Sequence, residues 1–410
     1  MKTFIALFFV SISVSAATPL APVALTNAPY RQVPFDVASN GTDFVTIWSD
    51  ERSSLDLSQE ARPAALYASR LNADGSAAAP AGHRLAPLSY FAKLARNGAG
   101  YLVVWTDFAK TSAMPLDADG APAAAPSVLA NVGSPLGLAS NGSSFLLVST
   151  DNAGFHTTIL TPDGKVAQTV PLAHDRQISS IWVLPNGSYQ FAAFQVACTN
   201  VICASAAVLT TVSSSGAVTE EKLFDLPSSV IAAAYGNGHV LVANLSTSQT
   251  GRVVEYRLFD AGTATRLATV QVAADASFCS CGDGSISAGW DGSEFLIGYQ
   301  WTPDLRAVRV TSDGVLLDGI APIVLDPAGG TAPVFASNGA TTVVVWGSGT
   351  LDSDVVSRSV RSFDDLAAAP VHLVSQSAAL ERRVQLAGGP NGPLAVWRAR
   401  YPNPAIAGGV

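Results

Sequence analysis

The sequence predicts an all-β protein, a single closed β-propeller of eight four-stranded blades. Two observations lead to this expectation. Charged residues make up only 13% of the 410 residues and hydrophobic residues 48%, which fits strands covered on both faces and excludes a disordered or coiled-coil chain. In addition, one short motif recurs along the whole chain, and a repeat of this kind is the signature of a radially repeated architecture.

The motif is clearest in three segments, which read VASNGTDFVTIWSD at 37–50, LARNGAGYLVVWTD at 94–107 and LASNGSSFLLVSTD at 138–151. More diverged copies follow, and the turn glycines of neighbouring copies lie 44 to 57 residues apart. These eight glycines are Gly41, Gly98, Gly142, Gly187, Gly238, Gly292, Gly339 and Gly392. The copies fill residues 17–410, which we therefore interpret as one domain.

Each copy contains four strand signals, called A to D in chain order. Strand A is a short apolar run such as 35–39, and an Asn-Gly or Asp-Gly turn connects it to an almost wholly apolar strand B such as 101–105. Strand C follows a variable loop, as at 306–314, and strand D closes the unit, as at 321–325. Continuous apolar strands indicate sheets packed on both faces, as in propeller blades. The alternative, a string of β-sandwich domains, needs about a hundred residues per domain and a linker that the sequence does not offer.

The two ends of the domain predict how the ring closes. The last copy offers strands A and B and a weak strand C but no strand D, whereas residues 20–26 (LAPVALT) resemble a strand D. We expect this N-terminal strand to complete the eighth blade by pairing in one sheet with residues 393–397. A ring of seven blades is the alternative if one diverged copy is not a blade.

The first sixteen residues predict a secretory signal peptide. Lys2 supplies a positive charge, residues 4–14 are apolar, and small residues precede a cleavage point before Ala17. A buried N-terminal strand is the alternative interpretation. The apolar run is too short to span a bilayer, and no later segment reaches the ~18 apolar residues of a membrane helix. We therefore expect a secreted or periplasmic protein with no membrane span.

The four cysteines fit export, because an oxidising compartment favours disulfides. They form two close pairs, Cys198 with Cys203 and Cys279 with Cys281. We expect two local disulfides, the second less firmly because its ring is small. A shared four-cysteine zinc site is the alternative, but the pairs belong to separate sectors of the ring.

The B–C and D–A loops lie on one face of the ring, called here the loop face, and variable loops on a rigid scaffold are where binding residues gather. Asp50, Asp107 and Asp151 occupy equivalent positions just after strand B in three consecutive copies. They predict either an arc of acids that binds a cation or partner, or local caps that accept hydrogen bonds from nearby backbone amides. If the arc holds a cation, calcium is the one we expect; otherwise the sequence predicts no metal and no cofactor.

Other candidate ligand-binding residues surround this arc. Glu51 and Arg52 lie in the charged B–C loop of the first copy, Trp301 takes the acid's place in the sixth, and an eighth blade would bring Arg398 and Arg400 beside Asp50.

The repeat pattern A-S-N-G-x-x-F/Y-L-V-V-W-x-D, followed by a strand that ends in D-G, resembles the repeats of exported bacterial β-propeller proteins, most of them uncharacterised. The resemblance covers nearly the whole chain. It implies the fold and says almost nothing about activity.

Composition and motifs limit the function classes. The net charge is −8 and basic residues are scattered, so nucleic acid is not an expected partner. The sequence contains no HExxH, G-x-S-x-G or P-loop motif, and His156, after the third B–C loop, is the histidine best placed for catalysis. We expect a monomeric, non-catalytic binding module for a protein or glycan, with a polysaccharide lyase or glycoside hydrolase as the alternative.

Overall fold

The structure is a computed structural model. It describes residues 28–29, 32–50, 64–72, 74–79, 81–172, 176–198, 203–225, 230–248, 251–275, 285–301, 304–319, 321–331, 333–348, 354–375, 377–378, 380–389 and 392–400. No helix in these ranges is long and apolar enough to cross a membrane.

Seven four-stranded antiparallel sheets form the blades of a propeller, and in each sheet the strands pair in chain order. The first three blades are β2 (Gln32–Ser39), β3 (Phe44–Asp50), β4 (Ala65–Leu71), β5 (His83–Ala86); β6 (Phe91–Asn97), β7 (Gly100–Thr106), β8 (Thr111–Leu116), β9 (Ser127–Leu129); and β10 (Ser134–Ser140), β11 (Phe145–Asp151), β12 (Gly154–Leu160), β13 (Val166–Pro171). Blades four and five are β14 (Arg176–Val183), β15 (Tyr189–Cys198), β16 (Cys203–Val212), β17 (Val218–Asp225); and β18 (Val230–Gly236), β19 (His239–Ser248), β20 (Gly251–Asp260), β21 (Arg266–Asp275). Blades six and seven are β22 (Ile286–Trp290), β23 (Glu294–Trp301), β24 (Asp304–Thr311), β25 (Ile323–Asp326); and β26 (Val334–Ser337), β27 (Thr342–Ser348), β28 (Asp354–Val360), β29 (His372–Ser375), with the 3-10 turn η2 (Phe363–Asp365) before β29.

The core lies between blades, not within a central layer. Each of seven hydrophobic clusters among the described residues spans one interface between neighbouring blades. Strand B shows why its sequence is apolar throughout: Val240 and Val242 pack towards blade four, whereas Leu241 and Ala243 pack towards blade six. Consecutive side chains of a strand point to opposite faces, so a blade buried on both faces needs apolar residues at every position.

The A–B turns add a polar link that repeats around the ring. Asn40 Oδ1 accepts hydrogen bonds from the amides of Thr42 and Asp43, which shapes the turn, and its Nδ2 donates to the carbonyl of Ala99 in the next blade at 2.7 Å. Asn338 of blade seven makes the same kind of bond to the carbonyl of Thr42 in blade one. Blade seven therefore joins blade one through the contact that joins blade one to blade two.

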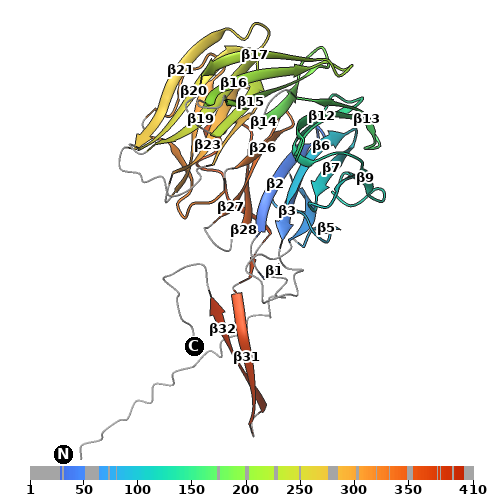
Figure 1. The fold of residues 1–410 in the computed structure, drawn as a ribbon. Helices are drawn as coiled ribbons and strands as arrows, with labels where there is room; N and C mark the ends of the chain where they lie inside the picture. The colour runs from blue at the N-terminus through green and yellow to red at the C-terminus, as the bar shows by residue number, and fades with distance from the viewer. Residues whose placement is uncertain are drawn as a thin grey trace, which may run out of the picture.

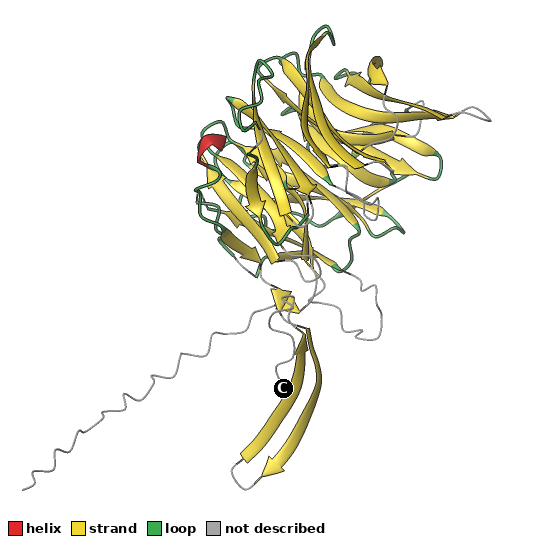
Figure 2. Ribbon diagram, turned by 90° about the vertical axis from the view of Figure 1, so that its left-hand side faces the viewer, coloured by secondary structure: helices red, strands yellow, loops and turns green. Residues whose placement is uncertain are grey.

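The predicted eight-blade ring is wrong, and the alternative of seven blades is correct. Phe44 and Trp48 of blade one share a hydrophobic cluster with Val343 and Val345 of blade seven, which leaves no place for an eighth sheet between them. The last repeat copy instead forms a two-stranded hairpin, β31 (Leu380–Gly389) with β32 (Gly392–Arg400), that stands away from the ring (Figures 1 and 2).

The N-terminal strand proposed to complete the last blade, residues 20–26, lies outside the described residues, as does the signal peptide. The chain on either side of the ring does meet nearby. β1 (Ala28–Pro29) pairs in parallel with β30 (Ser377–Ala378), so the segment that enters blade one contacts the segment that leaves blade seven.

Candidate functional site

Asp50 ends β3 and is completely buried. Its Oδ2 accepts hydrogen bonds from Gln32 Nε2 at 2.8 Å and from Trp48 Nε1 at 3.2 Å. Both donors are side chains of its own blade, whereas the capping interpretation expects backbone amides.

Asp107 and Asp151 accept hydrogen bonds from backbone amides that follow them, as the capping interpretation expects. Asp107 Oδ1 accepts from the amides of Ala109 at 3.0 Å and Lys110 at 2.9 Å. Asp151 Oδ1 accepts from the amide of Ala153 at 2.8 Å and contacts His156 Nε2 at 3.2 Å. The amide of Ala153 and, secondarily, His156 hold the pKa of Asp151 below its usual range. Within the described ranges, no group of three or more His, Cys, Asp or Glu side chains is arranged to hold a metal ion.

The other predicted loop-face residues are not brought together. Trp301 ends β23 and packs edge-on against Tyr299, with 5.8 Å between ring centres. Arg398 and Arg400 lie on β32, where they pair with Arg382 and Leu380, so the eighth blade that would have carried them to Asp50 is absent. Glu51 and Arg52 lie outside the described residues.

The cysteines are described only in part. Cys198 and Cys203 are directly opposite each other across β15 and β16. Cys279 and Cys281 lie outside the described residues. Both disulfides stay predictions.

An exposed aromatic cluster, Tyr90, Phe91 and Phe108, lies on the loop face of blade two. Tyr90 ends the D–A loop, Phe91 begins β6, and Phe108 is in the B–C loop beside Asp107. The ring of Phe108 lies 4.1 Å from that of Tyr90 and 6.1 Å from that of Phe91, centre to centre. The three residues are 41%, 46% and 64% exposed, in the order Tyr90, Phe91, Phe108, and a cluster of exposed rings marks a binding surface more than scattered single residues do.

Phe108 adopts φ of 67°, a left-handed conformation that is costly for a bulky side chain. Backbone strain of this kind costs about 1–3 kcal/mol and concentrates at functional sites. The turn keeps this conformation because the amide of Phe108 donates to Thr106 Oγ1 at 3.1 Å while Asp107 Oδ1 holds the next two amides. The strain therefore keeps an exposed ring against Tyr90.

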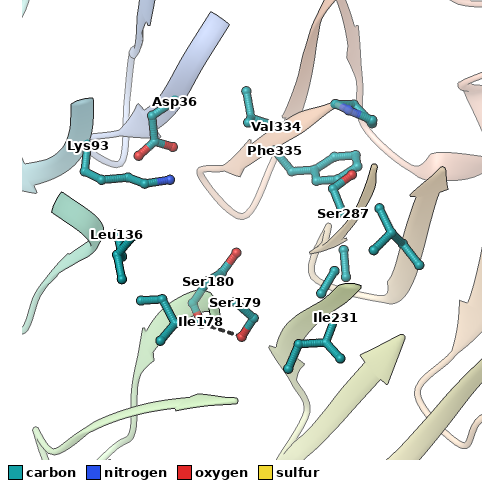
Figure 3. Close-up of a pocket in the computed structure, with 14 residues that line it drawn as sticks. Asp36, Lys93, Leu136, Ile178, Ser179, Ser180, Ile231, Ser287, Val334 and Phe335 are labelled. Atoms are coloured by element: carbon teal, nitrogen blue, oxygen red, sulfur yellow. Dashed lines mark hydrogen bonds between the residues drawn. The ribbon is translucent and has the colours of Figure 1, made fainter. Parts of the chain in front are cut away.

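The second candidate is a cavity of about 250 Å³ on the ring axis, lined by the innermost strand of every blade (Figure 3). Nine of the fourteen lining residues are apolar: Leu136, Ile178, Ile231, Ala232, Ile286, Ala288, Pro333, Val334 and Phe335. Three serines (Ser179, Ser180 and Ser287) and one oppositely charged pair, Asp36 of β2 and Lys93 of β6, supply the polar groups.

Asp36 is fixed by the main chain. Its Oδ1 accepts from the amide of Val37 at 2.9 Å, and its Oδ2 accepts from the amide of Leu94, in the next blade, at 3.1 Å. Burial raises the pKa of Asp36, and Lys93 and the two amides oppose this shift. A bulge precedes it, since Pro34 faces Trp48 and Asp36 faces Ile47, leaving Phe35 unpaired in the ladder. Bulges re-aim side chains next to sites, and this one directs the carboxylate to the seam between blades one and two.

The sequence analysis missed both the aromatic cluster and the axial cavity. A signal existed for the cavity: Asp36 and Lys93 each stand five residues before the turn glycine of their copy, where the other five blades have Gly137, Trp182, Ala233, Ser287 and Val334. Two opposite charges at one otherwise uncharged position of adjacent copies could have been noticed. For the cluster, the signal was the pair Tyr90–Phe91 immediately before strand A.

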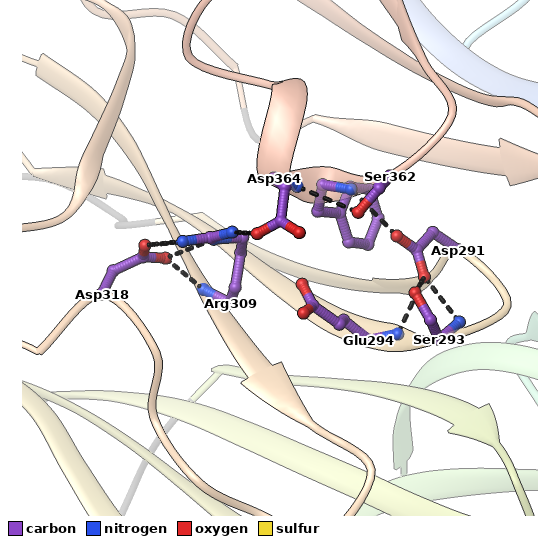
Figure 4. A network of polar contacts seen from close by, with 8 residues as sticks. Asp291, Ser293, Glu294, Arg309, Asp318, Ser362 and Asp364 are labelled. Carbon is purple, nitrogen blue, oxygen red and sulfur yellow. Dashed lines mark hydrogen bonds and ion pairs between the residues drawn. The ribbon is translucent and has the colours of Figure 1, made fainter.

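The third candidate is a network of charged and polar side chains that joins blades six and seven. It lies on the face opposite the loop face, in the A–B turns and C–D loops (Figure 4). Arg309 binds Asp318 through Nη2 at 2.7 Å and Nε at 3.1 Å, and it also pairs with Asp364 of η2. Asp291 Oδ2 accepts from the amide of Phe363 at 2.9 Å. These contacts connect the chain internally, so we interpret the group as structural.

Comparison with known proteins assigns no family to the chain. No protein-family model and no curated protein sequence matches the chain. Among solved structures, a catalytically inactive virginiamycin B lyase from Staphylococcus aureus with quinupristin is similar, with a TM-score of 0.48 and 15% identity over 82% of this chain and 97% of the lyase. Acylaminoacyl peptidase from Pyrococcus horikoshii has a TM-score of 0.48 and 11% identity over 83% of this chain. Prolyl oligopeptidase B from Galerina marginata has the same TM-score and 10% identity over 91% of this chain. The match spans 54% and 56% of the two peptidases, about half of each. These TM-scores lie below 0.5, so the likeness assigns neither a family nor a function. The seven four-stranded sheets of its own structure make the chain a seven-bladed β-propeller.

Proposed function

We propose that this protein is an exported, non-catalytic propeller that binds a glycan through its loop face, with Tyr90, Phe91 and Phe108 as the main contact. The observation that carries the proposal is this contiguous, exposed cluster of rings, one of which is held in a strained conformation. Aromatic faces bind the C–H faces of sugar rings, and a strained, preorganised contact reduces the ordering cost of binding.

Polar groups beside the rings support a sugar over a purely apolar partner. Asp107 uses Oδ1 for two backbone amides, which leaves Oδ2 to accept hydrogen bonds from sugar hydroxyls. Asp151 and His156 lie on the same face in the next blade. A binding site of this kind combines apolar area with a few placed polar groups.

Retention on immobilised polysaccharides tests the proposal. Phe108→Ala and Tyr90→Ala should each weaken retention on the glycan that the wild type binds by about tenfold or more, the range expected for an aromatic residue that dominates a contact. Val128→Ala is the matched control, because Val128 is a 60% exposed hydrophobic side chain on β9 of the same blade, outside the cluster. Retention that survives both aromatic substitutions would contradict the proposal. Binding to a protein partner but to no polysaccharide would mean that the ligand is a protein and not a glycan.

One contact favours the enzymatic alternative, a polysaccharide lyase or glycoside hydrolase. Asp151 lies 3.2 Å from His156 Nε2 and orients the ring, and a histidine held by a carboxylate can act as a general base. The same panel distinguishes the two functions. Release of products by the wild type and its loss in His156→Gln, with retention unchanged, would favour the enzyme.

A further inference from the structure

We propose that the axial cavity is a second binding site, separate from the loop face, for a small organic carboxylate with an apolar body. The ammonium of Lys93 would pair with the carboxylate, and the apolar walls would enclose the rest. Three observations carry this assignment: the charge balance of the cavity, its walls and its size.

The charge balance leaves a positive group available. Both carboxylate oxygens of Asp36 already accept main-chain amides, from Val37 and Leu94. Lys93 lines the same cavity, yet its ammonium forms no hydrogen bond or ion pair with any residue in the described part of the chain. Asp36 attracts the Lys93 ammonium through space without bonding to it, so an entering anion gains a direct charge-assisted contact with an ammonium that no residue of the described part already binds.

The apolar walls favour a ligand whose part beyond the carboxylate is apolar. Ile178 and Ile231 come from two different blades, and Val334 and Phe335 line the apolar side from a third (Figure 3). Ile286 of a fourth blade also lines the cavity. The hydroxyl of Ser179 donates a hydrogen bond to the carbonyl of Ala192 at 2.9 Å. Ser180 is exposed to the cavity and can donate to a carboxylate oxygen. Inorganic anions or sugars would leave most of this apolar surface uncompensated.

The size fits one ring. An apolar cavity of about 150 Å³ accepts benzene, and the axial cavity measures about 250 Å³. It can therefore take a six-membered ring together with a carboxylate. This is below the size of a typical drug-like site, so we expect binding in the micromolar to millimolar range.

Calorimetry with benzoate and cyclohexanecarboxylate tests the proposal on the full-length protein. Both acids should bind to the wild type, whereas neutral benzamide should bind at least tenfold more weakly because it cannot pair with Lys93. Lys93→Gln should weaken benzoate binding at least tenfold and Lys93→Arg should retain it. Lys110→Gln, which removes an exposed lysine of the same blade, is the matched control and should bind as the wild type does.

A second variant keeps the test independent of the charge. Ser180→Trp places a large side chain in the cavity and should abolish binding of both acids while the thermal melt stays cooperative. Phe108→Ala should leave benzoate binding unchanged, so a failed loop-face site and a failed axial site are distinguishable. No binding of either acid at about 10 mM, equal binding of benzamide, or full benzoate binding by a folded Lys93→Gln protein would each overturn the proposal.

Discussion

Trp48 Nε1 donates a hydrogen bond to Asp50 Oδ2 at 3.2 Å, and both residues are completely buried at the end of β3. Gln32 donates to the same oxygen at 2.8 Å. The carboxylate thus satisfies two buried donors, one on the innermost strand of blade one and one on the next strand.

Replacing Asp50 by alanine should therefore act on stability. Two buried donors would lose their acceptor, and such a loss costs about 2–4 kcal/mol. Asp107→Ala removes an exposed cap and should cost about 1 kcal/mol or less. Urea unfolding of both variants measures the difference.

Calcium titrated into the wild type and Asp107→Asn should give equal, negligible heats. A calcium heat lost in the variant would instead support the cation interpretation of the acidic arc.

Blade packing also requires a residue without a side chain at Gly236. A Cβ built on Gly236 of β18 would lie 2.1 Å from Trp290 of blade six, whereas one on Gly262 would have Asp260 Oδ1 at 3.5 Å as its nearest neighbour. Gly236→Ala should lower the free energy of unfolding by about 1–3 kcal/mol, the cost of overpacking. Gly262→Ala is the matched control and should be nearly neutral. Similar thermal melts for the two variants would show that the interface of blades five and six is looser than described.

The polar group between blades six and seven predicts a pH effect. Glu294 Oε2 is buried and has no hydrogen-bond partner, and burial, with Asp364 and Asp291 nearby, raises the pKa of Glu294 (Figure 4). A raised carboxyl pKa means that the folded state disfavours the ionised form, so ionised Glu294 destabilises the fold at neutral pH. Glu294→Gln should raise stability at pH 7 by about 0.5 kcal/mol.

That gain should shrink as the pH falls through the raised pKa of Glu294, and it should vanish below about pH 4, where the wild-type side chain is protonated in both states. Glu221→Gln, at an exposed position of β17, serves as the control and should show no such dependence. Thermal melts between pH 4 and pH 8 give the comparison. A constant difference across this range would mean that Glu294 does not titrate as described.

The blade count shows where sequence reasoning stopped. Hydrophobic periodicity and the Asn-Gly turns predicted four antiparallel strands per repeat, as each of the seven blades has, because those signals are local. The number of blades depends on how wedge-shaped neighbouring sheets pack, which no single repeat records. The last copy has the A–B hairpin signal, and it does form the hairpin β31–β32. Phe44 and Trp48 nevertheless pack on Val343 and Val345, which closes the ring without that hairpin.

The candidate sites divide in the same way. Position could be predicted: Asp50 and Asp151 end strand B and Asp107 follows it. The contacts of these carboxylates could not be predicted, because a carboxylate at a strand end can accept hydrogen bonds from its own chain or bind a ligand. The axial cavity depends on which innermost-strand side chains reach the axis. Three adjacent residues, Ile178, Ser179 and Ser180, line it on β14, which is bulged there. Three adjacent residues, 286–288, also line it on β22, which pairs there without a bulge, so strict alternation of side chains does not predict the lining.

The opposed cysteines support the expected disulfide in blade four. Directly opposed residues of antiparallel strands have Cα atoms about 4.5–5.5 Å apart, within the range that a disulfide spans. Cys198 and Cys203 hold such positions. In protein isolated from an oxidising compartment, peptide mapping should recover them linked, and Cys198→Ser with Cys203→Ser should cost about 2 kcal/mol, since the closed loop is short. Two free thiols in that material would contradict the prediction.

Phe108 offers a test in which stability and binding move in opposite directions. Its φ of 67° is readily adopted by glycine, and its ring is 64% exposed, so little packing is lost when it is removed. Phe108→Gly should therefore raise the free energy of unfolding by up to about 1 kcal/mol, while glycan retention falls as far as in Phe108→Ala. Phe155 lies at a partly buried position of β12, packed in the cluster between blades three and four. Phe155→Gly should therefore lower the free energy of unfolding, because a core contact is lost, and should leave glycan retention unchanged. If Phe108→Gly destabilised the protein instead, the ring would be part of the packing of blade two, and the strained turn would no longer be an argument for a binding surface.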